Sequence, residues 1–89
     1  MNKILIITTE GCEACKIAEV NINKAVFQSS KEIQVDVKNH KDINKNDLRS
    51  YKATDYPTVV YIVGGLIRLV KSGTYPAAVY LRWIDMYLV

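Results

Sequence analysis

Short apolar runs separated by polar turns predict four strands along the chain. The first run, Lys3–Thr9, is nearly continuous and rich in β-branched residues, which is typical of a strand buried on both faces. Residues Glu32–Lys38 alternate apolar and polar side chains, which predicts a half-exposed strand. Val59–Val63 has the pattern of a second buried strand, and Leu66–Lys71 that of a strand returning beside it. These runs together predict one four-stranded sheet.

The segments between and after these runs contain patterns that predict helices. Over Cys15–Phe27 the apolar residues recur with helical spacing and form one stripe. A short helix is predicted over about Lys45–Tyr51, and a last helix over Pro76–Leu88, where proline suits the first turn. The predicted order is β-α-β-α-β-β-α. Because helices join the first three strands, we expect these to be parallel neighbours, with a hairpin at Gly64-Gly65 adding an antiparallel edge strand.

Length and composition indicate one globular domain. With 89 residues there is no room for a second core, so residues 1–89 are assigned to a single domain. The net charge is only +3 and the basic residues are scattered, so we expect no nucleic-acid partner. The apolar run after Lys3 is too short for a signal peptide or a membrane span. We therefore expect a cytoplasmic monomer with no membrane partner.

Both cysteines of the chain fall in one motif, Cys12-Glu13-Ala14-Cys15, between the first strand and the first helix. A helix N-terminus has unpaired N–H groups and the positive end of the macrodipole, and both favour a thiolate over a thiol. A spacing of three residues is close to one helical turn and lets the two sulfurs meet. In a reducing compartment such a pair indicates catalysis or metal binding rather than a structural staple. The motif therefore predicts a dithiol that forms, breaks and exchanges a disulfide.

The element order, the Cys-x-x-Cys motif after the first strand and Tyr56-Pro57-Thr58 at the opening of the third strand resemble the thioredoxin/glutaredoxin superfamily. The likeness covers essentially the whole chain, without the N-terminal strand and helix that thioredoxins carry. It implies an α/β, thioredoxin-like fold with a four-stranded mixed sheet flanked by helices. It also implies that Cys12 is the exposed nucleophile, Cys15 the buried resolving cysteine and Pro57 a cis-proline facing the disulfide.

The resemblance further implies a substrate groove beside the disulfide. In that groove the backbone of the residue before the proline would pair with an extended substrate segment as an added strand. The substrate-binding residues implied in this way are Gly11, Glu13, Ala14, Tyr56, Pro57 and Gly73. The implied function is a thiol-disulfide oxidoreductase that reduces disulfide-containing proteins and needs no cofactor. Its electrons would come from a thioredoxin-reductase-like enzyme or from a small thiol.

The chain departs from the family pattern close to the motif. Gly11 stands where thioredoxins usually carry Trp, and Ile6 where they often carry a buried Asp, so the proton of Cys15 must leave by another route. Glu10 stands where glutathione-using glutaredoxins usually carry a basic residue. Glu13 places a negative charge inside the motif, which opposes the helix effect and indicates a reductant. These departures favour a dithiol protein that does not depend on glutathione, although glutathione stays open as a reductant.

Three other functions stay open on the sequence. A glutathione-dependent glutaredoxin would act on glutathione mixed disulfides. A non-catalytic thioredoxin-fold binding module would keep its cysteines without exchanging them at a useful rate. A soft-metal carrier would bind Cu(I) or Zn(II) through the two thiolates. A structural zinc site needs four ligands, and only His40 remains as a further nitrogen or sulfur ligand, so we expect no metal site.

Overall fold

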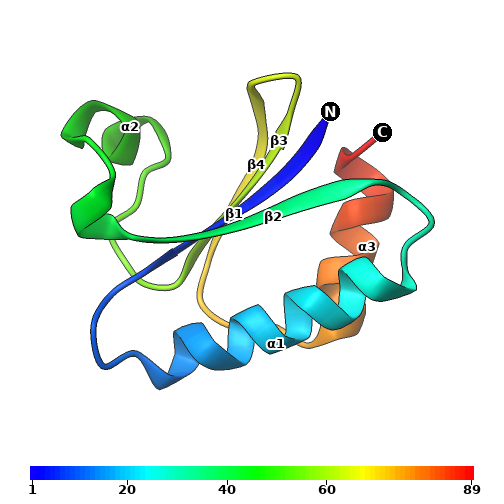
Figure 1. The fold of residues 1–89 in the computed structure, drawn as a ribbon, viewed down its shortest axis with the longest axis horizontal. Helices are drawn as coiled ribbons and strands as arrows, with labels where there is room; N and C mark the ends of the chain where they lie inside the picture. Colours follow the sequence, from blue (N-terminus) through cyan, green and yellow to red (C-terminus); the bar gives the residue numbers. More distant parts are fainter.

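One mixed sheet organises the chain, which the computed structural model describes from residue 1 to residue 89. Its strands are β1 (Asn2–Thr8), β2 (Ile33–Asn39), β3 (Thr58–Val63) and β4 (Leu66–Ser72). They lie in the order β2-β1-β3-β4 across the sheet (Figure 1). The helices are α1 (Glu13–Gln28), α2 (Lys45–Ser50) and α3 (Ala77–Tyr87), with a 3-10 turn at His40–Asp42. The predicted element order and the mixed sheet are confirmed.

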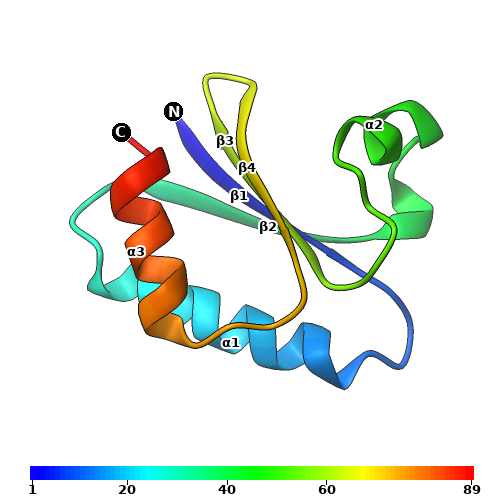
Figure 2. The ribbon, with the colours of Figure 1, turned by 180° about the vertical axis from the view of Figure 1, so that it is seen from behind.

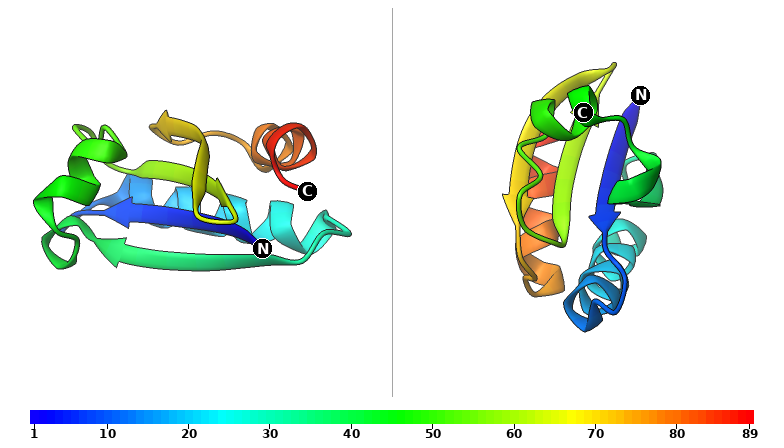
Figure 3. Two further views of the ribbon diagram at one scale, coloured as in Figure 1. Left: turned by 90° about the horizontal axis from the view of Figure 1, so that it is seen from above. Right: turned by 90° about the vertical axis from the view of Figure 1, so that its left-hand side faces the viewer.

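The direction of β3 differs from the sequence-based expectation. β1 and β2 are parallel, with Ile4 opposite Val35, as the crossover through α1 predicts. β3 is antiparallel to β1, with Ile4 opposite Tyr61, so the expectation of three parallel strands was wrong. The reason is that α2 has only six residues and lies at the end of the sheet where β2 finishes (Figure 3). A parallel connection must return along the sheet, whereas this chain enters β3 from the end at which it left β2.

The hairpin between β3 and β4 forms at the predicted glycines. Gly64 and Gly65 have φ angles of 57° and 82°, which this kind of two-residue turn requires. β4 then runs antiparallel to β3, with an irregularity in the ladder at Tyr61 and Ile62. β2 and β4 are therefore the two edges of the sheet.

Two helices cover one face of the sheet, and Figure 2 shows α1 and α3 lying against each other on that side. Along α1 the buried residues Ala18, Ile22 and Ala25 recur at helical spacing, as predicted. Ile17 and Val20, next to this stripe in the sequence, are each 53% exposed. The core of this face contains nine buried residues: Ile4, Ile6, Ile22, Ala25, Val59, Tyr61, Tyr80, Ile84 and Leu88.

The opposite face is covered by a short helix and a loop. Its buried residues are Leu5, Ile7 and Val60. Half-buried side chains from α2 and its flanking loops pack against them: Ile43, Leu48, Tyr51, Ala53 and Tyr56. Because β1 contributes to both clusters, it is buried on both faces, as its continuous apolar pattern predicts.

Polar side chains close the end of the two-helix face. Lys31 Nζ donates hydrogen bonds to the C=O groups of Ile84 and Leu88, at 3.0 and 2.8 Å. Both carbonyls lie at the C-terminal end of α3, where the Ile84 C=O also accepts from the Leu88 N–H at 3.1 Å. The Asn2 side chain donates to the C=O of Val89 at 2.7 Å and accepts from its N–H at 3.0 Å. Residues 2 and 89 therefore lie side by side, and Figure 1 shows the two chain ends close together.

Candidate active site

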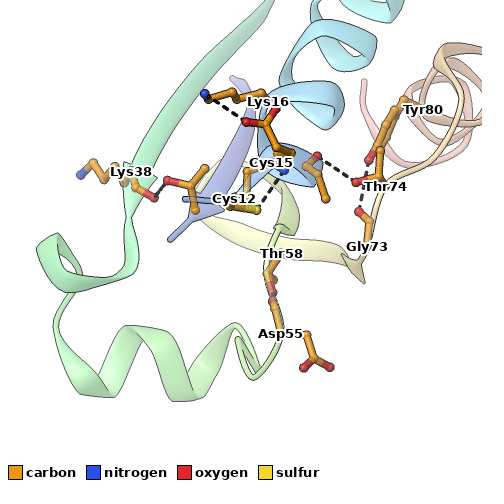
Figure 4. Close-up of a disulfide and its surroundings, with 12 residues drawn as sticks. Cys12, Cys15, Lys16, Lys38, Asp55, Thr58, Gly73, Thr74 and Tyr80 are labelled. Atoms are coloured by element: carbon orange, nitrogen blue, oxygen red, sulfur yellow. Dashed lines mark hydrogen bonds and ion pairs between the residues drawn. A yellow bond between two sulfur atoms is a disulfide. The ribbon is translucent and has the colours of Figure 1, made fainter. Parts of the chain in front are cut away.

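A disulfide joins Cys12 and Cys15 at the N-terminus of α1 (Figure 4). The two Cα atoms are 5.2 Å apart. β1 delivers the chain to this point, and Gly11, with a φ of 66°, makes the turn into the helix. Cys12 is the N-cap residue, and its Sγ accepts a hydrogen bond from the Cys15 N–H at 3.0 Å. The helix start therefore holds both sulfurs at its positive end.

The two sulfurs differ in their access to solvent. Cys15 is only 4% exposed, whereas Cys12 is half-buried. Cys15 begins the inward stripe of α1, and the buried Ala18 and Ile22 continue that stripe into the core. A partner approaching from solvent therefore meets Cys12 first.

Hydrogen bonds bring three of the predicted groove segments together. The Gly73 N–H donates to the Pro57 C=O at 2.9 Å, which ties the end of β4 to the start of β3. Thr74 Oγ1 donates to the Ala14 C=O at 2.9 Å, which ties the next residue to the cysteine motif. Pro57 is buried, and the Tyr56–Pro57 peptide bond is cis. Figure 4 shows Gly73 and Thr74 on one side of the disulfide.

Tyr56 contributes in two ways to this region. Its ring stacks on the His40 ring, with centroids 4.9 Å apart, and packs against the loop-covered face of the sheet. The side chain therefore holds the loop that leads into Pro57. The N–H and C=O of Tyr56 have no backbone hydrogen-bond partner. The sequence indicated no structural role for His40, because its stacking partner lies in a distant loop.

Tyr80 supports the Gly73 segment from the core. Its hydroxyl donates to the Gly73 C=O at 3.4 Å and accepts from the Tyr75 N–H at 3.3 Å. Figure 4 shows Tyr80 beside the Gly73–Thr74 segment. Burial raises the pKa of the Tyr80 phenol, so the hydroxyl keeps its proton and remains a donor. The sequence predicted the helix that carries Tyr80 but gave no signal for this polar contact.

Two ion pairs flank the motif on the exposed surface. Lys16 Nζ lies 3.6 Å from Glu13 Oε1, and Lys41 Nζ lies 2.9 Å from Glu10 Oε1. All four side chains are well exposed, so each pair stabilises the fold little. Each pair also neutralises a charge beside the disulfide, including that of Glu13 within the motif.

A cavity of about 210 Å³ opens beside the disulfide. Besides Gly11 and the two cysteines, it is lined by Lys16, which directly follows the motif, and by four residues that the sequence did not single out: Thr8, Thr9, Glu19 and Val37. Glu19 lies four residues after Cys15, so helical spacing alone could have found it. Val37 reaches the cavity through the pairing of β2 with β1, where it lies opposite Ile6, and that register is not readable from the sequence.

The cysteine pair is the chemical feature around which the site is built. Throughout residues 1–89, no group of three or more His, Cys, Asp or Glu is arranged to hold a metal ion. None of the helices combines the length and the apolar content needed to cross a bilayer.

No protein-family model matches the sequence, and no curated protein matches it either. Solved structures do match the fold. One, described as the structure of a malarial protein, aligns with a TM-score of 0.79 and 17% identity, over 100% of this chain and 99% of its own. Thioredoxin-2, described as a component of the malaria parasite protein secretion machinery, aligns with a TM-score of 0.78 and 17% identity, over 98% and 84%.

A chloroplast protein shows the same likeness. Chloroplastic thioredoxin z aligns with a TM-score of 0.72 and 20% identity, over 97% of this chain and 77% of its own. At these identities the similarity establishes the fold, and the resemblance stated from the sequence is confirmed at that level. The chain has a thioredoxin-like fold, with a Cys-x-x-Cys disulfide at the start of its first helix.

Proposed function

We propose that this chain is a thiol-disulfide oxidoreductase that reduces protein disulfides by dithiol exchange at Cys12 and Cys15. The observation that carries the proposal is the unequal access of two bonded sulfurs, one half-buried at a helix N-cap and the other 4% exposed. A disulfide of a partner can reach the first sulfur, whereas the second is suited to attack from within the molecule. The thioredoxin-like fold supports the same assignment.

The reaction would proceed in two exchanges. The Cys12 thiolate attacks one sulfur of the substrate disulfide, forming a mixed disulfide while the other substrate sulfur leaves as a thiolate. The Cys15 thiolate then attacks Cys12 Sγ, forms the intramolecular disulfide and releases the second substrate sulfur. Two electrons pass from the dithiol to the substrate. The Cys15 N–H, 3.0 Å from Cys12 Sγ, and the positive end of α1 would stabilise the first thiolate.

The backbone around the proline supports an extended protein substrate. Tyr56 has an N–H and a C=O without backbone partners, and such groups recruit an added strand. The hydrogen bonds from Gly73 to Pro57 and from Thr74 to Ala14 support this arrangement, because they join the other proposed groove segments to each other and to the motif. The proposed substrate contacts are those inferred from the sequence, namely Gly11, Glu13, Ala14, Tyr56, Pro57 and Gly73.

The proposed electron donor is a thioredoxin-reductase-like enzyme or a small thiol, acting on a cytoplasmic monomer without a cofactor. Glu10 argues against dependence on glutathione, because it places a carboxylate where a carboxylate of the peptide would otherwise be bound. Lys41 pairs with Glu10 at 2.9 Å, so its ammonium group is not available to replace the basic residue that glutathione-using glutaredoxins usually carry near this position. Glutathione would then serve as one reductant among several.

Reduction of insulin with dithiothreitol as donor tests the proposal. Wild type should accelerate the reaction, and Cys12→Ser should fall to the thiol background because the first exchange is lost. Cys15→Ser, its matched control with one sulfur removed, should accumulate a mixed disulfide that mass spectrometry detects. Wild-type activity no higher than background would contradict the proposal. Activity confined to glutathione mixed disulfides would instead indicate a glutaredoxin, and tight 1:1 binding of Cu(I) would indicate a metal carrier.

A further inference from the structure

The resolving exchange needs an acceptor for the proton of Cys15. The nucleophile in thiol-disulfide exchange is the thiolate, so a thiol must lose its proton before it attacks. Cys15 is 4% exposed, which limits direct transfer to bulk water. The buried side chains with polar groups outside the motif are Asn2, Thr58 and the phenols Tyr61 and Tyr80, and none of them is a carboxylate. The acceptor must therefore be sought among the partly exposed groups around the disulfide.

Glu19 is the carboxylate that shares a cavity with Cys15. The two residues are four positions apart on α1, a spacing that puts their Cβ atoms about 5–6 Å from each other. Side chains of a helix lean toward its N-terminus, so the Glu19 side chain covers the turn that carries Cys15. Both residues line the cavity of about 210 Å³ beside the disulfide.

Glu19 is also free for this role. It is half-buried and makes no ion pair or side-chain hydrogen bond within the protein. Glu13, the acid within the motif, pairs with Lys16 and does not line the cavity. Lys16 does line the cavity and is, apart from the cysteines, the only other titratable side chain there. The end of β1 and the residue after it contribute two threonines, and β2 contributes Val37, none of which carries charge.

The cavity is suited to hold water between the two groups. One water molecule occupies about 30 Å³ of liquid and needs two to four polar partners. The cavity of about 210 Å³ exceeds that volume several times, and its lining residues include Thr8 and Thr9, whose side chains carry hydroxyl groups. A short chain of water molecules from Cys15 Sγ to the Glu19 carboxylate is therefore accommodated without moving the backbone.

We infer that Glu19 accepts the proton of the Cys15 thiol through water in this cavity during the resolving exchange. The inference rests on the proposed dithiol reaction. The Cys15 S–H bond breaks, and its proton passes to Glu19 while the sulfur keeps the electron pair. That thiolate forms a bond to Cys12 Sγ, the bond from Cys12 to the substrate sulfur breaks, and the substrate leaves as a thiolate. Glu19 then returns the proton to solvent, so it ends the cycle ionised.

Stopped-flow reaction of the reduced protein with dithiobis(nitrobenzoate) separates the two exchanges. Attack by Cys12 releases one coloured thiolate in a first phase, and attack by Cys15 on the resulting mixed disulfide releases a second in a later phase. Glu19→Gln should leave the first phase unchanged and slow the second by about tenfold or more, because a positioned base contributes at least that much. Glu19→Asp should recover part of the loss. Glu32→Gln, which changes an acid next to the far end of β2, is the matched control and should leave both phases unchanged.

Electrostatics alone predicts the opposite sign, which makes the test decisive. If Glu19 acted only as a nearby negative charge, its removal would favour the Cys15 thiolate and accelerate the second phase. The gap between wild type and Glu19→Gln should also close at alkaline pH, where hydroxide removes the proton directly. A second phase that is unchanged or faster in Glu19→Gln overturns the inference, as does equal slowing of both phases. Absence of a second phase in wild type would instead refute the dithiol reaction itself.

Discussion

The two faces of the sheet are covered in different ways, and the disulfide lies at the end where the two coverings meet. On one face, α1 and α3 enclose nine buried residues. On the other, only three residues are buried, and α2, which helps to cover them, contains no buried residue. Figure 3 shows α2 at one end of the sheet rather than across it. The first face is a closed core, whereas the second is a thin cover of loop.

The difference indicates how the molecule separates its stable core from the proposed substrate groove. The closed face anchors Cys15 through the buried stripe of α1. The loop-covered face supplies Tyr56, whose backbone groups are left without partners, and the chain then enters the buried Pro57. Segments that must accept a partner cannot bury all of their hydrogen-bonding groups, so they belong to the less tightly packed side. Three experiments test this difference between the faces.

The largest expected effect comes from matched truncations of the two faces. Ile84→Ala, in the closed core, should lower the free energy of unfolding by about 3 kcal/mol, since it removes a fully buried side chain and leaves a cavity. Leu48→Ala, half-buried on the loop-covered face, should cost about 1 kcal/mol. Urea unfolding of both oxidised variants measures the two values. Equal losses would mean that the two faces contribute alike to the free energy of unfolding.

A smaller effect is expected at the polar end of the closed face. Lys31→Met removes the ammonium group that bonds to the C=O groups of Ile84 and Leu88 while keeping most of the aliphatic chain. We expect a loss of about 1.5 kcal/mol, because charged hydrogen bonds to helix-end carbonyls are lost. Lys41→Met, which removes only an exposed pair with Glu10, serves as the control and should change stability by less than about 0.5 kcal/mol. Similar losses in thermal unfolding would show that the capping contact adds nothing.

The smallest effect concerns alkaline pH and Tyr61. Burial raises the pKa of this phenol above its usual value, and its hydroxyl donates to the Tyr80 C=O at 3.0 Å. Above about pH 10 the unfolded chain releases a proton that the folded protein retains, so stability falls as pH rises toward the folded pKa. Tyr61→Phe should lower the free energy of unfolding by about 1 kcal/mol at neutral pH. Above about pH 10 the stability of the variant should fall less steeply than that of wild type, with the two slopes differing by up to about 1.4 kcal/mol per pH unit. Parallel declines of the two proteins in urea titrations would argue against a buried, protonated Tyr61.

The strands and long helices could be predicted because each carries its own periodic pattern. Lys3–Thr9 is apolar enough to indicate burial on both faces, and the stripe of α1 is readable at helical spacing. The direction of β3 could not be predicted in that way. It depends on the end of the sheet at which the chain stands after the short α2, and packing at that end sets this rather than local sequence.

The residues of the site also divide into those that local sequence identifies and those that only the tertiary structure brings together. Cys12, Cys15 and Pro57 stand in local motifs, so the family resemblance could assign a role to each of them from the sequence. The contact of Thr74 with Ala14 joins residues 60 positions apart, and the stacking of His40 on Tyr56 joins two loops. Contacts of this kind arise from the register of the sheet, so the sequence alone does not contain a visible signal for them.

The central position of β1 has a consequence for how the chain is made. Among the four strands β1 leaves the ribosome first, yet its neighbours β2 and β3 are both synthesised later. Until Tyr61 has emerged, the backbone of Ile4–Ile7 has no β3 to pair with along one edge. Until Ile84 has emerged, one face of β1 also lacks part of its helical cover. An unpaired apolar strand of this kind is prone to pair with other chains. A nascent chain stalled before β3 would therefore be an aggregation hazard, and a chaperone that binds extended apolar segments would find its target within the first strand.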